Sequence, residues 1–201
     1  MIWYDKIAIL YDFFTNFIYK EARVNLIQNL KIKNGDRVLV IACGTGQSFK
    51  LIEDIIGDSG EIIALDYSKG MLKFAQKVVD ANNFGNVKLL NMDARDLNIE
   101  NLSKNNIISD FDIIIGELAF SVIPNWQTVM ENSYLLLKEN GKIGLLDWYR
   151  EKNDFLTRII NFLAEADITR DTARAAEKIF TKFSVIERFI FNNVYIGIGV
   201  K

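Results

Sequence analysis

Short apolar segments alternate with helical patterns along most of the chain, and this alternation restricts the fold more than any other feature. The apolar segments are Val38–Ile41, Ile62–Leu65, Val87–Leu90, Phe111–Ile115, Ile143–Leu146, Phe183–Phe191 and Val194–Val200. The first five are rich in Ile, Val and Leu, as is typical of strands in a parallel sheet that is covered on both faces. Apolar residues at helical spacing follow Ser48, Ser68 and Asn125. The order strand, helix, strand predicts a doubly wound α/β fold with right-handed crossovers.

The ends of the chain depart from this alternation. Only Asn192–Asn193 separates the last two apolar segments, which predicts a hairpin and an antiparallel final strand. With 201 residues, the chain is expected to form one domain, 1–201. Within it we expect four parts, listed as an N-terminal helical lid (1–30), a cofactor-binding core (35–148), a helical insertion (150–182) and a C-terminal hairpin (183–201).

Composition excludes several classes of function. The formal net charge of −2 gives no basic surplus for a nucleic-acid backbone. One cysteine permits no internal disulfide, so a reducing, cytoplasmic setting is expected. No apolar run approaches about 20 residues, so we expect neither a signal peptide nor a transmembrane segment. Histidine is absent, so the chemistry lacks the usual general base of neutral pH, and no metal site is expected.

A glycine-rich turn, "ACGTGQS", follows the first predicted strand and opens the first predicted helix of the core. Such a turn directs backbone N–H groups towards a ligand. A P-loop is excluded, because no Lys-Ser or Lys-Thr follows the glycines. A dinucleotide site is disfavoured, because Phe49 stands where its third glycine would be. S-adenosylmethionine, whose amino-acid end needs close backbone approach, suits the turn best; a turn without ligand is the other interpretation.

Two carboxylates lie at the ends of the next two predicted strands. Asp66 stands 20 positions after Gly46, where it can accept hydrogen bonds from the two ribose hydroxyls of an adenosine. Asp93 lies just beyond the third strand, where it can bind the adenine amino group. Either residue alone could be a turn or loop aspartate, but their joint placement favours an adenosine cofactor.

Five segments together resemble the class I S-adenosylmethionine-dependent methyltransferases. They are "GDRVLVIACGTG", "IIALDYSKGML", "NMDARDL", "FDIIIGELAFSVIPNW" and "LLLKENGKIGLLDW". The resemblance implies a Rossmann-like, mostly parallel sheet of seven strands in the order 3-2-1-4-5-7-6, with helices on both faces. It also implies cofactor contacts at Ala42, Gly44, Thr45, Gly46, Asp66, Tyr67, Met71, Asp93, Ala94, Glu117 and Leu118. In two departures from the family pattern, Val40 replaces a first-strand acid that helps hold the methionine ammonium group, and Ala42 replaces a glycine.

The segments "YDKIAILYD", "SVIPNW" and "YIGIGVK" resemble the quinone-biosynthesis and phospholipid N-methyltransferase branch. We therefore expect in-line methyl transfer to a nitrogen of a small molecule or lipid head group, with S-adenosylhomocysteine as product. The alternatives are carbon methylation of a quinone precursor and a catalytically idle S-adenosylmethionine-binding protein. An NAD-dependent oxidoreductase is a weaker alternative because of Phe49.

Two groups of residues are candidates for the acceptor side. Tyr4 and Tyr11 could line the transferred methyl group and stabilise a cationic product. Asp147, Trp148 and Tyr149 follow the fifth strand and could bind the acceptor. All five could equally pack in the core. The aromatic N-terminal helix could also rest on a membrane surface, and the sequence leaves the oligomeric state open.

Overall fold

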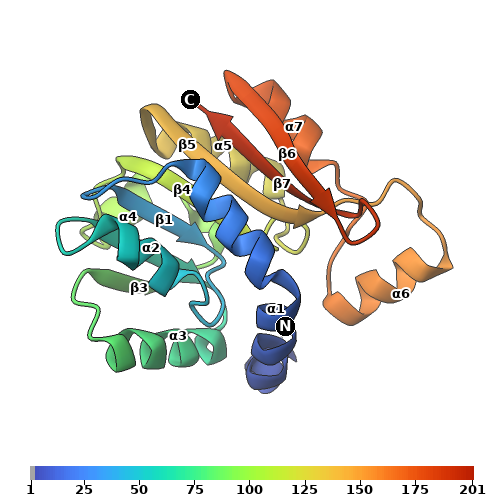
Figure 1. Cartoon of the computed structure of the whole chain (residues 1–201), viewed down its shortest axis with the longest axis horizontal. Coiled ribbons are helices and arrows are strands. Elements are labelled where there is room, and N and C mark those ends of the chain that lie inside the picture. Colours follow the sequence, from blue (N-terminus) through green and yellow to red (C-terminus); the bar gives the residue numbers. More distant parts are fainter. Residues whose placement is uncertain (1–2) are drawn as a thin grey trace.

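The computed structural model describes the backbone of residues 3–201 and the side chains of residues 17–155, 157–162 and 165–201. Within this range a seven-stranded sheet has the order β3-β2-β1-β4-β5-β7-β6 (Figure 1). The strands are β1 Arg37–Ile41, β2 Glu61–Asp66, β3 Val87–Asn91, β4 Phe111–Glu117, β5 Leu137–Trp148, β6 Lys182–Phe189 and β7 Val194–Val200. The first five pair in parallel, whereas β7 is antiparallel to both β5 and β6. The predicted fold class and strand order are confirmed.

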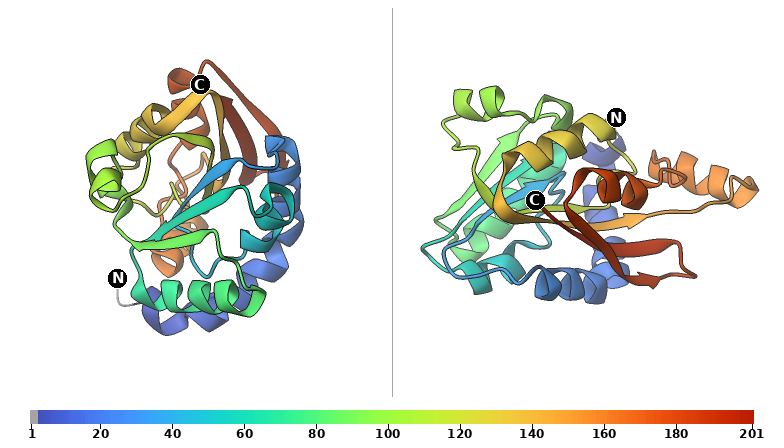
Figure 2. Two further views of the ribbon diagram at one scale, coloured as in Figure 1. Left: turned by 90° about the vertical axis from the view of Figure 1, so that its left-hand side faces the viewer. Right: turned by 90° about the horizontal axis from the view of Figure 1, so that it is seen from above.

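Helices cover both faces of the sheet (Figures 1 and 2). One face carries α1 Trp3–Leu30, α2 Phe49–Ile56 and α3 Lys69–Asn82. The other carries the short 3₁₀ helix η1 Ala94–Asp96, α4 Ile99–Lys104, α5 Trp126–Leu136 and α7 Thr172–Ile179. Helix α6, Phe155–Ala164, stands away from both layers.

Strand β1 shows why the central strands read as continuous apolar segments. Val38 and Val40 pack against α1 and α2, whereas Leu39 and Ile41 pack into the core on the opposite face. All four residues are buried, because successive side chains of a strand point to opposite faces and both faces are covered.

The chain reverses its direction of winding between β1 and β4. From β1 it passes to β2 and β3 on one side, and it then returns to β4 on the other side. Ligands of open α/β sheets bind at such a switch point, beyond the carboxyl ends of the strands. Among the described residues, no helix combines the length and the apolar character that a membrane span requires.

Candidate cofactor site

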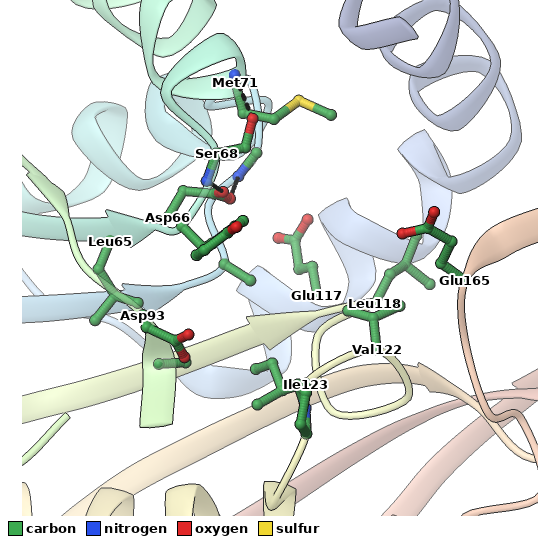
Figure 3. A pocket seen from close by; sticks show the side chains of 15 residues that line it. Leu65, Asp66, Ser68, Met71, Asp93, Glu117, Leu118, Val122, Ile123 and Glu165 are labelled. Atoms are coloured by element: carbon green, nitrogen blue, oxygen red, sulfur yellow. Dashed lines mark hydrogen bonds between the residues drawn. The ribbon is translucent and has the colours of Figure 1, made fainter. Parts of the chain in front are cut away.

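A cavity of about 260 Å³ lies beyond the carboxyl ends of β1, β2 and β4 (Figure 3). Its described lining residues are Ala42, Gly44, Leu65, Asp66, Tyr67, Ser68, Met71, Asp93, Ala94, Glu117, Leu118, Val122, Ile123, Pro124 and Glu165. Nine of the eleven cofactor contacts implied by the resemblance are therefore found around one cavity; the two exceptions are Thr45 and Gly46. Residues that lie far apart in the sequence come together here because parallel strands end at the same edge of the sheet.

The glycine-rich turn brings backbone to the cavity wall. A Cβ added to Gly44 would meet no heavy atom within 4 Å, so this position is open towards the cavity. A Cβ added to Gly46 would lie 2.6 Å from the Phe49 ring, so Gly46 is needed for close packing of the turn on α2. Both glycines, and Ala42, have positive φ angles. Gly44 thus exposes its backbone to the cavity, while the absence of a side chain at Gly46 lets the turn pack against Phe49.

Asp66 is held in a fixed orientation at the end of β2. Its Oδ2 accepts a hydrogen bond from the Gly44 backbone N–H at 2.8 Å, and its Oδ1 accepts one from the Ser68 N–H at 2.8 Å. Ser68 in turn caps α3 by accepting a hydrogen bond from the Met71 N–H at 3.0 Å. The carboxylate thereby joins the glycine-rich turn to the first turn of α3, and it lines the cavity between them.

Asp93 has two local partners. It accepts a hydrogen bond from the Arg95 backbone N–H at 2.9 Å, and it pairs with the Arg95 guanidinium, whose Nη2 lies 2.7 Å from Oδ2. Hydrogen bonding to this guanidinium holds the pKa of Asp93 below its usual range, although partial burial opposes the shift. Asp93 therefore caps η1 and presents an ionised carboxylate to the cavity at once.

A polar cluster joins α1 to the end of β4. Nε of Arg23 donates to Oε2 of Glu117 at 2.7 Å, and Nη2 of Arg23 donates to the side chain of Gln47. The Ser48 hydroxyl donates to the other oxygen of Glu117. These four residues, which we call the Arg23–Glu117 cluster, line a second cavity of about 50 Å³ together with Thr45. Both cavities share Ala42, Gly44, Glu117 and Leu118 among their lining residues.

Arg23, Gln47 and Ser48 were not predicted as site residues. One signal for Arg23 was available, since it lies on the buried face of α1 with Tyr19, Ala22, Leu26 and Leu30. An arginine within such an apolar stripe needs a partner, because an unpaired buried charge is very costly.

The opposite side of the cavity is mainly apolar. Leu118, Val122, Ile123 and Pro124 come from the loop after β4, and Glu165 follows α6 directly. Figure 3 shows Leu118, Val122 and Glu165 facing Asp66 and Asp93 across the cavity. Glu165 was not predicted as a site residue.

The residues at the end of β5 that were predicted to bind the acceptor do not line the cavity. Asp147 is fully buried and accepts hydrogen bonds from the backbone N–H groups of Ser121 at 3.0 Å and Trp148 at 2.8 Å. Burial raises its pKa to about 6, although these hydrogen bonds oppose the shift. The Trp148 indole donates to the Tyr19 hydroxyl at 2.9 Å, and the Tyr149 N–H donates to the Asn193 carbonyl at 2.7 Å. None of the three lines either cavity as described.

Tyr4 and Tyr11 belong to α1, but their side chains lie outside the described residues. Among the described side chains, no group of three or more Cys, Asp or Glu residues is arranged to hold a metal ion.

Comparison with known proteins places the chain in a family. A family model described as a methyltransferase domain matches residues 32–188. The demethylmenaquinone methyltransferase of Geobacillus kaustophilus is 27% identical over 148 residues, which cover 72% of this chain and 60% of the relative. The chain spans about three fifths of the length of the curated relatives that it matches.

Solved structures share the fold at low sequence identity. The YcgJ protein of Bacillus subtilis has a TM-score of 0.70 at 15% identity, covering 90% of this chain and 98% of that one. A SAM-dependent methyltransferase of Aquifex aeolicus has a TM-score of 0.65 at 15% identity, covering 89% and 88%. The family model covers more than three quarters of the chain, and these solved structures share its fold, so the chain belongs to the methyltransferase domain family.

Proposed function

We propose that this chain transfers a methyl group from S-adenosylmethionine to a ring carbon of a hydroquinone, the reduced form of a quinone precursor. The curated relatives support this choice, since they are named for demethylmenaquinone. They favour the carbon-methylation alternative of the sequence analysis over its first expectation, N-methylation of a small molecule or head group.

The residues around the cavities suit S-adenosylmethionine. In this proposal Asp66 binds the ribose hydroxyls, and adenine lies against Leu65, Met71 and Ala94 with Asp93 at its edge; all five residues line the cavity. We propose that the amino-acid end lies in the second cavity, which Gly44, Thr45 and the Arg23–Glu117 cluster line. When bound, S-adenosylmethionine supplies an electrophilic methyl group on sulfur and becomes the neutral thioether S-adenosylhomocysteine.

The observation that carries the proposal is the character of the acceptor side. Leu118, Val122, Ile123 and Pro124 make an apolar wall that suits a flat aromatic ring, and the exposed side chain of Glu165 lies on the same side of the cavity. An apolar wall can also hold a flat acceptor aligned for in-line transfer.

Carbon methylation also needs proton transfer by the protein. A hydroquinone carbon becomes nucleophilic when the neighbouring hydroxyl loses its proton. In our proposal Glu165 accepts that proton. The new carbon–carbon bond replaces a ring carbon–hydrogen bond, and the displaced ring proton passes to water as the ring regains its aromaticity. A carboxylate can act as this base in a chain without histidine.

The test uses S-adenosylmethionine with a labelled methyl group and three acceptors. One is a naphthohydroquinone with a free ring carbon beside a hydroxyl. The second is the same compound with that carbon blocked by a methyl group. The third is a vesicle of phosphatidylethanolamine. We expect carbon-bound label in the first acceptor only, and loss of that signal in Asp66→Ala.

The other outcomes select the alternatives. Label in phosphatidylethanolamine would restore N-methylation of a head group. Binding of S-adenosylhomocysteine without transfer to any of the three would contradict the proposal and favour an idle binding protein.

A further inference from the structure

We infer that the Glu117 side chain takes over the role of the first-strand carboxylate that Val40 lacks, and that Glu117 and Arg23 together hold the charged amino-acid end of S-adenosylmethionine. The inference rests on the S-adenosylmethionine binding in the proposed function. It adds a residue-level account of how this chain recognises the methionine part.

The pairing of β1 with β4 places Glu117 where a substitute is needed. Ile41 is paired with Gly116, so the next residues along the two parallel strands are Ala42 and Glu117. Val40 is buried and lines the smaller cavity, where it offers only methyl groups. Glu117 lines both cavities, so its carboxylate lies where the adenosine part and the amino-acid part of the ligand would meet. The carboxylate of this chain is thus on the strand next to β1, at the same edge of the sheet.

The Arg23–Glu117 cluster carries the charges that a bound amino acid requires. An α-amino acid has one ammonium and one carboxylate group. Glu117 offers a carboxylate to the ammonium group, and Arg23 offers a guanidinium to the carboxylate. A guanidinium has five N–H donors, more than its bonds to Glu117 and Gln47 use. The pair is neutral overall, like the zwitterion that it would bind.

Burying two charged side chains costs free energy, and a role in ligand binding would account for that cost. Arg23 is 4% exposed and the Glu117 side chain 11% exposed, and removing both charges from water often costs as much as their attraction returns. Gln47 and Ser48 fix the two side chains from the glycine-rich turn and its helix, so the charges keep one orientation. Fixed charges beside a cavity favour a ligand, because little reorganisation is needed on binding.

The experiment compares three ligands by calorimetry with the full chain. S-adenosylhomocysteine carries the complete amino-acid end. Its deaminated analogue lacks only the ammonium group, and 5′-methylthioadenosine lacks the whole amino-acid end. We expect the wild type to bind S-adenosylhomocysteine at least 10-fold more tightly than the deaminated analogue. In Glu117→Gln this preference should shrink to less than 3-fold, while the affinity for 5′-methylthioadenosine stays within 2-fold of wild type.

Two further variants complete the design. Arg23→Lys keeps the charge but loses the fork of donors, and it should weaken S-adenosylhomocysteine at least 5-fold with little effect on 5′-methylthioadenosine. Glu53→Gln is the matched control. Glu53 is also buried and is hydrogen-bonded to Asn86 at 3.3 Å, but it lines neither cavity as described, so all three affinities should stay at wild-type values.

The outcomes separate this inference from the proposed function. A wild type that binds S-adenosylhomocysteine and its deaminated analogue equally would overturn the inference without any variant. Equal weakening of all three ligands by Glu117→Gln would also overturn it, because that pattern indicates a structural role only. A wild type that binds none of the ligands would instead contradict the proposed function.

Discussion

The buried carboxylate of Asp147, at the end of β5, accepts a hydrogen bond from the backbone N–H of Ser121, 3.0 Å away in the loop after β4. The same loop supplies Leu118, Val122, Ile123 and Pro124 to the acceptor side of the cavity. Asp147 is therefore a positioning residue that holds this loop against the end of the sheet.

The pH dependence of stability should show the burial of the Asp147 carboxylate. Because burial raises the pKa of Asp147 in the folded chain from 3.8 to about 6, the folded chain binds its proton more tightly than the unfolded chain does. This contribution to stability is full below about pH 4 and is lost as the pH rises through about 6. A difference of roughly two pH units corresponds to about 3 kcal/mol. The free energy of unfolding of the wild type, taken relative to Asp147→Asn, should fall by up to that amount between pH 4 and pH 7.

Urea denaturation at a series of pH values measures this difference. Asp58→Asn, at an exposed position, is the control and should run parallel to the wild type. A difference between wild type and Asp147→Asn that does not change with pH would contradict the assignment.

Asp66→Asn should weaken S-adenosylhomocysteine by about 10- to 100-fold. The substitution removes the charge from a cavity-lining group that we propose binds the ribose hydroxyls, and hydrogen bonds to charged groups contribute about 1.5–3 kcal/mol. Calorimetry with S-adenosylhomocysteine measures the loss, with Asp58→Asn again as the control. An affinity within 2-fold of wild type would remove Asp66 from the site.

Glu165→Gln should lower turnover of a hydroquinone by about 100-fold at neutral pH, because general-base catalysis contributes at least about that factor. The affinity for S-adenosylhomocysteine should not change, since Glu165 lies on the acceptor side. Activity of the variant should recover as the pH rises and the acceptor hydroxyl ionises without help.

Initial rates as a function of pH test this prediction. Glu151→Gln, at an exposed position before α6, should behave like the wild type. A variant whose turnover is reduced equally at every pH would speak against a role for Glu165 in proton transfer.

Ala42→Gly should leave stability unchanged or raise it by up to about 1 kcal/mol. Ala42 has a φ of +52°, in a region that costs residues other than glycine about 1–2 kcal/mol. Relief of this strain is partly offset by the greater freedom of glycine in the unfolded chain. Ala64→Gly, on the buried strand β2, is the matched comparison and should lower stability by at least about 1 kcal/mol. Thermal unfolding of both variants decides the question, and a clear loss in Ala42→Gly would contradict it.

Strands that consist of a short, continuous run of apolar residues could be predicted from the sequence. Strands β1, β2 and β4 are apolar on both faces, so their burial could be seen without knowledge of their neighbours. Strand β5 was only partly predicted, from Ile143–Leu146, because its first half contains the polar residues Lys138–Asn140. The hairpin was predicted, but its connection is longer than the Asn192–Asn193 pair suggested. Ile190, Phe191 and Asn192 all have positive φ, and the apolar residues Ile190 and Phe191 give no sign in the sequence that the chain turns there.

Contacts between distant segments could not be predicted in this way. Arg23 and Glu117 are 94 positions apart, and no local pattern links them. Asp66 and Asp147 both end strands, and the same reasoning placed both at a ligand site. The loop after β4 folds over the end of β5 and encloses Asp147, whereas the end of β2 remains open to the cavity.

Helix α6 stands away from the sheet and its covering helices (Figures 1 and 2), and Phe155 and Phe162 are about 80% exposed. The two ends of the segment that carries α6 are joined by a hydrogen bond from the Arg150 backbone N–H to the Ile168 carbonyl, at 2.7 Å. Amide hydrogens of α6 should therefore exchange with deuterium through local opening, much faster than those of β1 and β4. The two sides of the cavity should therefore differ in how readily they open. Asp66 is fixed at the end of β2 and should become mobile only when the whole domain opens. Glu165 directly follows α6 and should move with that helix, so the proposed acceptor can enter and leave while the loop after β4 and the rest of the fold stay in place.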